Sequence, residues 1–354
     1  MRRLGEGSTR GALAFLRPAH GLVAGADVLA GFVLASPASP GESYSLAVAP
    51  LLFASAVLIS AAGSVFALVF SQARGAVLPG AGGGAPGLTT PLPEGGAWAY
   101  AKALEEGRAT VRRSFLAGAA LALGGIFAAM GAALTAGRLP VYFAALMFLV
   151  SWARAGRGAE LAVLGPASAG LSRALSLGMG MGATGEIVFL ADRSLLLAPA
   201  LYFAMGGVVE AVEHAEGEGG RRFLLVGALG ALLAVFALAG LAYMRTGLSW
   251  IVALTGAAFL VSRAAPAIGS LAPGEVRRFA EGALLAGPFL SASVCFGRWE
   301  ARGALLAIGV CALGLVVPAA RSLRERGRRT PGGALGRAEQ AAHRSAARQR
   351  HESG

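Results

Sequence analysis

The chain has 354 residues, of which 55% are hydrophobic and 14% charged, with a mean hydropathy of +0.64. Repeated apolar runs of about twenty residues predict an all-α polytopic membrane protein and exclude a membrane β-barrel, whose strands alternate in shorter segments. The net charge of +12 does not indicate nucleic-acid binding, because the basic residues lie between the apolar runs and in the tail.

The apolar runs divide the chain into three parts. Residues 1–19 are predicted to be a basic cytoplasmic N-terminus, residues 20–320 a transmembrane domain, and residues 321–354 a basic, disordered cytoplasmic tail. Within the domain we expect bilayer crossings at residues 20–35, 46–70, 114–136, 139–152, 164–182, 195–212, 223–243, 247–265, 280–296 and 304–319. Because several boundaries contain Gly or Pro, the count is nine to ten spans. Residues 71–113 form a long cytoplasmic loop, whose second half, 95–113, has the pattern of an amphipathic helix.

The distribution of Lys and Arg predicts the orientation of the chain. With a cytoplasmic start and ten crossings, 25 of the 31 basic residues fall on the cytoplasmic side, and Arg173 falls within the membrane. The exceptions on the outer side are Arg138, Arg193, Arg245, Arg298 and Arg302. The positive-inside rule therefore predicts that both termini are cytoplasmic.

The run at residues 164–182 contains an arginine, Arg173, at its middle and many small residues around it. A charged group that faced lipid would cost several kcal/mol, so we expect Arg173 to face the interior of the bundle. The small residues would allow another helix or a ligand to approach closely. Two interpretations stand open. Arg173 is either paired with a buried carboxylate, for which Asp27 in the first run is the candidate, or it binds an anion together with Asp27 and Ser176.

Several segments, in order, resemble the UbiA superfamily of membrane prenyltransferases. They are Leu16-Arg17-Pro18, the ADVLAGF of residues 26–32, the AAG of residues 61–63, and the PLPEG of residues 91–95. The LGP…GLSRALSLGMG of residues 164–182 is similar to a bacterial UbiA-like branch, including members from Ebo-type clusters, and Leu201-Tyr202 and Glu213 fit a later segment of that branch. The resemblance covers about residues 16–320. It implies a UbiA-like helical bundle with a central cavity, in a bacterial inner membrane.

The chain departs from the family where the family binds Mg²⁺. The resemblance implies an Asp-rich motif at the end of the second span, but the aligned positions are Ala67, Leu68, Ser71 and Gly75. The chain contains only two aspartates, Asp27 and Asp192, so the motif is not displaced elsewhere. Mg²⁺ needs hard oxygen ligands, and a prenyl diphosphate needs its charge neutralised before it leaves.

The second acidic motif of the family would follow the sixth span, where this chain offers only glutamates. Glu210 and Glu213 are three residues apart and share a helix face, and Glu216 follows them. They are weak candidates for catalysis and for Mg²⁺ binding, and the simpler interpretation is a solvated loop at a helix end. We therefore expect no metal or other cofactor, or Mg²⁺ if the chain is an active enzyme. The cysteines, Cys295 and Cys311, lie in apolar runs and are interpreted as core residues.

Three functions follow from the resemblance and its departures. The first is a prenyltransferase homologue that has lost diphosphate ionisation and binds an isoprenoid or another lipophile, or acts in a membrane complex with partners from its operon. The second is an active intramembrane prenyltransferase that uses Glu210, Glu213 and Arg173. The third is a permease or export component. Mg²⁺-dependent release of diphosphate separates the second from the others.

Overall fold

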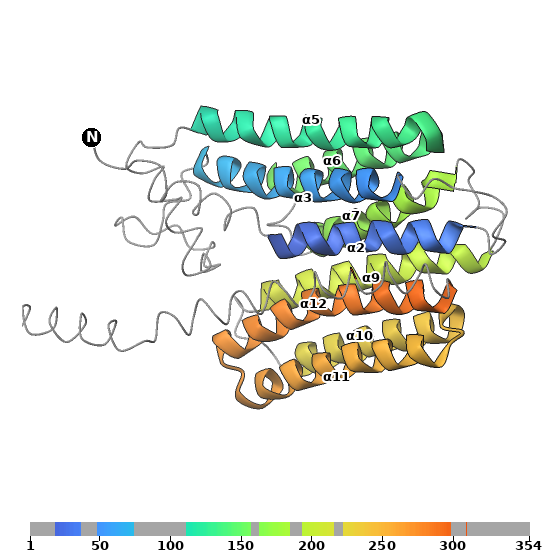
Figure 1. Cartoon of the computed structure of the whole chain (residues 1–354). Coiled ribbons are helices and arrows are strands. Elements are labelled where there is room, and N and C mark those ends of the chain that lie inside the picture. Colours follow the sequence, from blue (N-terminus) through green and yellow to red (C-terminus); the bar gives the residue numbers. More distant parts are fainter. Residues whose placement is uncertain are drawn as a thin grey trace, which may run out of the picture. The chain divides into compact units, whose positions relative to one another are not determined.

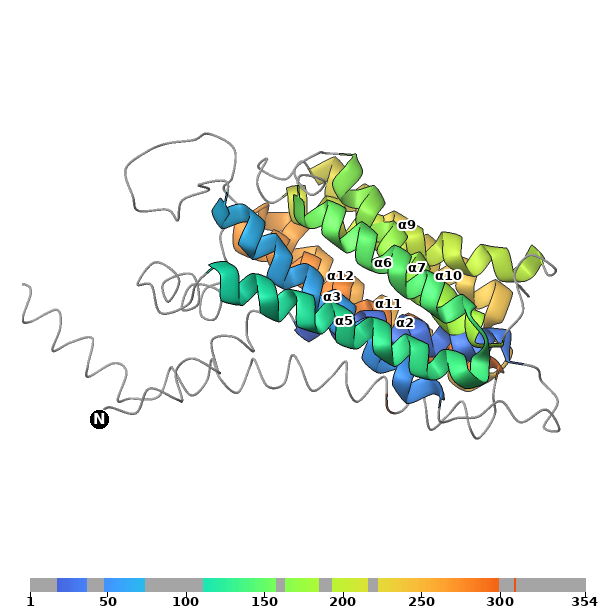
Figure 2. The same cartoon turned by 90° about the horizontal axis from the view of Figure 1, so that it is seen from above.

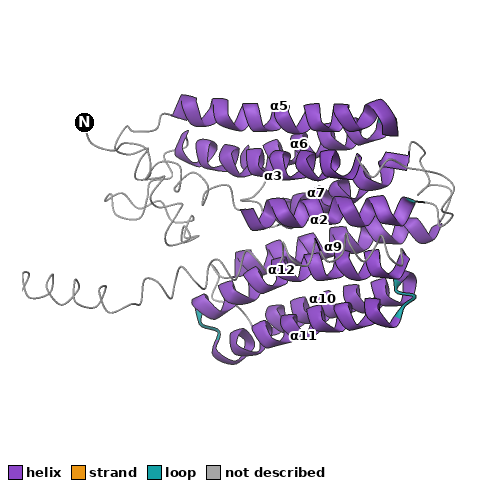
Figure 3. Ribbon diagram, in the orientation of Figure 1, coloured by secondary structure: helices purple, strands orange, loops and turns teal. Residues whose placement is uncertain are grey.

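The computed structural model describes residues 18–36, 48–73, 111–156, 163–184, 193–215, 222–298 and 309. All of them belong to one compact unit, residues 1–311. These residues are helical apart from short connections, and they include no strand (Figures 1 and 3). The helices are α2 (Pro18–Ala35), α3 (Val48–Ala73), α5 (Val111–Ala136), α6 (Leu139–Gly156), α7 (Leu164–Met181), α9 (Arg193–Ala215), α10 (Arg222–Tyr243), α11 (Gly247–Ser270) and α12 (Pro273–Arg298). A 3₁₀ turn, η2 (Gly182–Thr184), follows α7.

Local signals explain where several helices begin and end. Pro18 is the first residue of α2, a position where the missing N–H costs nothing. Gly137, with φ of 80°, makes the turn between α5 and α6. The side chain of Thr246 accepts a hydrogen bond from Ser249 N at the start of α11. At its end, Leu271 adopts the left-handed conformation and its N–H donates to the Ala267 carbonyl at 2.9 Å.

Successive helices run in opposite directions (Figures 1 and 2). The helices α2, α7 and α12 therefore begin at the same end of the bundle, which we call the proximal end. The helices α3, α6, α9 and α11 finish there. This arrangement makes α7 parallel to α2 and antiparallel to its other two large neighbours, α6 and α9.

The centre of the bundle is formed by α2 and α12. Nearly every described side chain of α2 is buried, and 83% of the apolar window of α12 is buried. By contrast, α5, α6, α10 and α11 expose large apolar side chains such as Leu134, Tyr142 and Leu241. Because seven of the described helices are long and apolar enough to cross a bilayer, these outer faces are the lipid-facing surface. The apolar part of α2 is shorter, and α7, which carries Arg173, is not among the seven.

Glycines allow α2 and α7 to touch through their backbones. A Cβ atom at Gly180 would lie 1.9 Å from the Val28 carbonyl oxygen, and one at Gly31 would lie 2.0 Å from the Leu177 carbonyl oxygen. On the next face of α7, a Cβ at Gly170 would lie 2.4 Å from the Phe203 carbonyl oxygen of α9. The expectation that small residues in 164–182 admit another helix is therefore confirmed, on two faces of α7.

Nine of the ten expected spans correspond to helices. Several helices extend past the apolar run, most clearly α12, which begins at Pro273 rather than near residue 280. Hydropathy marks the part of a helix inside the bilayer, and the helix itself continues into the polar interface. The tenth span at 304–319 lies outside the described residues apart from Gly309, as do residues 1–17, the loop at 74–110 and the tail at 321–354.

Candidate functional site

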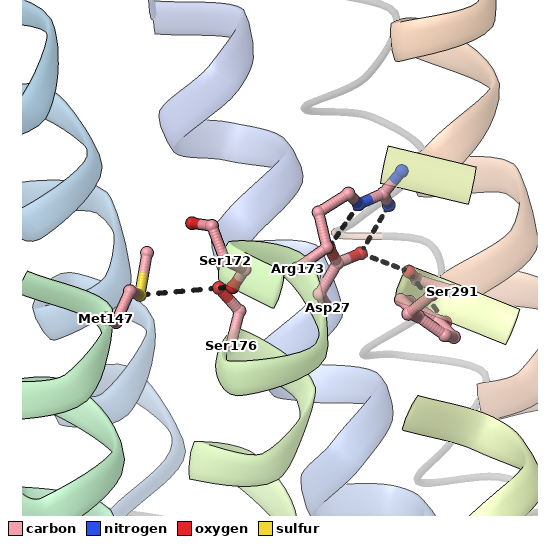
Figure 4. A network of polar contacts seen from close by, with 7 residues as sticks. Asp27, Met147, Ser172, Arg173, Ser176 and Ser291 are labelled. Carbon is pink, nitrogen blue, oxygen red and sulfur yellow. Dashed lines mark hydrogen bonds and ion pairs between the residues drawn. The ribbon is translucent and has the colours of Figure 1, made fainter. Parts of the chain in front are cut away.

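Arg173 and Asp27 form an ion pair with two hydrogen bonds in the middle of the bundle (Figure 4). Arg173 Nε donates to Asp27 Oδ2 at 2.7 Å, and Arg173 Nη2 donates to Asp27 Oδ1 at 2.8 Å. Asp27 is fully buried, and each residue is the tenth of the 18 in its helix, α2 and α7. The expected pairing is present in the structure. It gives both buried charges a partner near mid-membrane depth, where an isolated charge is most costly.

Two further helices supply hydroxyl groups to the same carboxylate. Ser291 of α12 donates from Oγ to Asp27 Oδ1 at 3.1 Å, and Tyr202 Oη of α9 lies 3.0 Å from Ser291 Oγ. Since a serine hydroxyl has one proton and Ser291 gives it to Asp27, Tyr202 must be the donor to Ser291. The carboxylate is thus the end of a directed chain of hydrogen bonds, and α2, α7, α9 and α12 all contribute to the network.

The guanidinium of Arg173 lies in a space that two glycines leave open. A Cβ atom at Gly287 of α12 would lie 2.7 Å from Nη2, and one at Gly206 of α9 would lie 3.0 Å from Cδ. The Arg173 Cζ lies 5.6 Å from the centre of the Tyr202 ring, within range of a cation–π contact. Nη1 is buried without a hydrogen-bond partner among the described residues.

This geometry favours a structural pair over an anion site. The formal charges of Arg173 and Asp27 cancel, so a bound anion would leave net negative charge in the bilayer interior. Ser176 does not join the network, because it faces the other side of α7 (Figure 4). Its Oγ donates to the Ser172 carbonyl at 2.9 Å and lies 3.4 Å from Met147 Sδ of α6.

A second ion pair lies nearer the proximal end, between Arg154 of α6 and Glu210 of α9. Glu210 is only 5% exposed, so it is not the solvated glutamate that a loop position would give. Glu213, one turn further along α9, also acts electrostatically on Arg154. The helices α6 and α9 both pack on α7, and a Cβ atom at Gly207 of α9 would lie 3.3 Å from the Pro166 carbonyl oxygen in the first turn of α7. The ion pair therefore links the two neighbours of α7 near the start of that helix.

The described residues do not offer a set of ligands that fits Mg²⁺. Ala67, where the resemblance places a metal ligand, has no oxygen in its side chain, and Gly75 and Glu216 lie outside the described residues. Glu210 is engaged by Arg154. In the described part of the chain, no three His, Cys, Asp or Glu side chains come together in a way that could hold a metal ion.

Comparison with solved structures identifies the fold. A digeranylgeranylglyceryl phosphate synthase of membranes matches with a TM-score of 0.52 and 13% identity, covering 82% of this chain and 98% of that one. A UbiA homologue from Archaeoglobus fulgidus, bound to DMAPP and Mg²⁺, matches with a TM-score of 0.51 and 14% identity, covering 80% and 98%.

The chain has the UbiA prenyltransferase fold. The resemblance read from the sequence segments is thus supported by shape over most of the chain. No family model matches the sequence, and no curated protein matches it either.

Within this UbiA fold, the sequence predicts the Asp27–Arg173 pair. It does not predict that Arg154 pairs with Glu210, or that Ser291 donates to Asp27. Asp27 and Arg173 stood out because each is a charge inside an apolar run. Arg154 could have been found from Glu210, because a glutamate that is buried near the end of a helix requires a cation as its partner. Ser291 gave no signal, because a lone serine in an apolar helix usually bonds to its own backbone, as Ser293 does.

Proposed function

We propose that the chain is a divergent UbiA-superfamily protein of a bacterial inner membrane that binds an isoprenoid or another lipophile and does not ionise a prenyl diphosphate. The fold supports the membrane and isoprenoid parts of this proposal, because a UbiA homologue of the same fold binds DMAPP and Mg²⁺. The side chains of this protein support the second part of the proposal, that a prenyl diphosphate is not ionised.

The observation that carries the proposal is the state of the buried carboxylates. Asp27 is occupied by Arg173 and Ser291, and Glu210 is occupied by Arg154. A carboxylate held by an arginine has already been neutralised, so it adds little attraction for Mg²⁺. At the proximal end of α3, where a first acidic cluster would be needed, Ala67 offers no ligand at all.

The decisive experiment measures binding and turnover on the same sample. We expect purified protein in lipid nanodiscs to be stabilised against heating by geranylgeranyl or farnesyl derivatives, with little change when Mg²⁺ is added. We expect no diphosphate release with an aromatic or a polar acceptor, because the metal clamp is missing.

The competing function is an active prenyltransferase that uses Glu210 and Glu213. It predicts diphosphate release that requires Mg²⁺ and disappears in Glu210→Gln/Glu213→Gln, while the control Glu275→Gln, at the partly exposed start of α12, retains it. That result would overturn the proposal. Transport of the lipophile across proteoliposomes, without release of diphosphate, would instead favour a permease or a component of an export complex.

The proposed orientation places the proximal end in the cytoplasm, with both termini on that side. Terminal reporter fusions are expected to be active only as cytoplasmic reporters. Within the bundle, Arg278→Cys at the proximal end should be protected from an impermeant maleimide in intact cells, and Arg245→Cys at the opposite end should be labelled. The reverse labelling pattern would contradict the orientation.

A further inference from the structure

Arg263 is an exposed arginine on a membrane-spanning helix. It lies seven residues before the end of α11, Gly247–Ser270, which corresponds to about 10 Å from the proximal end of the helix. On the side of α11 that carries Arg263, the side chains towards the opposite end include the half-buried Phe259 and Leu248, which is 51% exposed. A charge in such a position is costly unless its head reaches the interface or meets an anion.

The side chain of Arg263 is held in a groove between α11 and α12. A Cβ atom at Gly282 of α12 would lie 2.7 Å from Arg263 Cγ, so the arginine stem occupies the space that this glycine leaves. The Arg263 Cζ lies 5.3 Å from the centre of the Phe259 ring, and that ring stacks on Phe289 of α12 at 6.2 Å. The guanidinium is therefore positioned by both helices while it stays exposed.

Further arginines lie at the same end of α10, α11 and α12. Arg278 is one turn before Gly282, its side chain is 63% exposed, and it pairs with Glu275. Arg222 Nη2 donates to the Gly269 carbonyl at 3.3 Å, which brings the start of α10 to the end of α11. Arg277 pairs with Glu281, with 3.5 Å between Nε and Oε1. Among the described residues of this region, four arginines face two glutamates, so the excess charge is positive.

We propose that the groove between α11 and α12 at Arg263 binds the phosphate of an anionic phospholipid of the bilayer. The planar guanidinium matches two phosphate oxygens, and Arg222, which contacts the end of α11 at Gly269, adds a second positive charge at the same end of the bundle. The acyl chains lie along the same side of α11 as Arg263, past Phe259 towards the exposed Leu248. The location is typical of headgroup sites, which are basic recesses between transmembrane helices on the cytoplasmic side. The site is independent of the proposed isoprenoid function.

The proposal is tested by native mass spectrometry and thermal melting of the purified full chain in detergent. Phosphatidylglycerol is expected to be retained and to raise the melting temperature, whereas phosphatidylcholine is not. Arg263→Gln is expected to weaken phosphatidylglycerol binding at least fivefold. The matched control Arg245→Gln, an exposed arginine at the opposite end of α11, should leave it unchanged.

Two further arms keep the test decisive. Arg263→Lys keeps the positive charge but loses the planar guanidinium that donates to two phosphate oxygens, so this variant should bind phosphatidylglycerol with intermediate affinity. It replaces Arg263→Gln in the test if the glutamine variant does not fold. Inorganic phosphate alone should not stabilise the protein, because it lacks the acyl chains. Equal binding of the two lipids, unchanged affinity in both Arg263 variants, or a response to inorganic phosphate as large as that to lipid would each overturn the proposal.

Discussion

Replacing Arg173 with alanine is expected to lower the free energy of unfolding by about 3–5 kcal/mol, because it leaves Asp27 buried and charged without its partner. Asp27 is fully buried and receives two hydrogen bonds from Arg173. Because the carboxylate does not reach solvent, water does not replace these two hydrogen bonds when the arginine is removed. The measurement is the melting temperature and the folded fraction after extraction in detergent.

The double variant Asp27→Asn/Arg173→Gln distinguishes the interaction between the two residues from the effect of each residue alone. It removes both charges and is expected to recover much of the loss, because neutral amides hydrogen-bond to each other and to Ser291. Arg277→Ala is the control for loss of an arginine. Its pair with Glu281 is partly exposed, at 31% and 43% of the side chains, and should contribute about 0–1 kcal/mol. Losses in Asp27→Asn and Arg173→Gln that simply add in the double variant would show that the two residues do not act as a pair.

Gly180→Ala is expected to have the second large effect. The added Cβ would lie 1.9 Å from the Val28 carbonyl oxygen and 2.7 Å from Phe32 N, and neither backbone atom can rotate away. The helices α2 and α7 must then separate, which also pulls Asp27 from Arg173. We expect a loss at or above the upper end of the usual overpacking range of about 1–3 kcal/mol, measured by melting in detergent.

The matched control is Gly230→Ala, in the interior of α10. Nothing lies within 4 Å of the position that its Cβ would occupy. The same substitution should there be neutral or stabilising by up to about 1 kcal/mol, because alanine is the better helix former. If both variants melted alike, the close approach of α2 and α7 through Gly180 would not limit stability.

The sequence predicts the helices of this protein well, because a twenty-residue apolar run has few alternatives in a bilayer. Even α7, which is not among the apolar spans, was expected from its length and its interior arginine. The Asp27–Arg173 pair was also within reach, since two lone charges inside apolar runs each need the other. These inferences depend on local composition and on the cost of burying charge.

The contacts that complete the site depend on the rotation and register of each helix. Sequence alone does not show that Ser291 faces Asp27, or that Gly206 and Gly287 make room for Arg173. Nor does it show which of several proximal arginines reaches Glu210. Arg154 is set there by the antiparallel packing of α6 and α9 on α7, a consequence of tertiary structure.

The separation of Asp27 and Arg173 along the chain has a consequence for synthesis. The residues are 146 positions apart, and translation at about 5–20 residues per second makes Arg173 about 7–30 s after Asp27. During that interval the short apolar helix α2 carries an aspartate with no arginine to meet it. Asp27 therefore obtains its arginine only when α7 has been made, and its hydrogen bond from Ser291 only when α12 has followed.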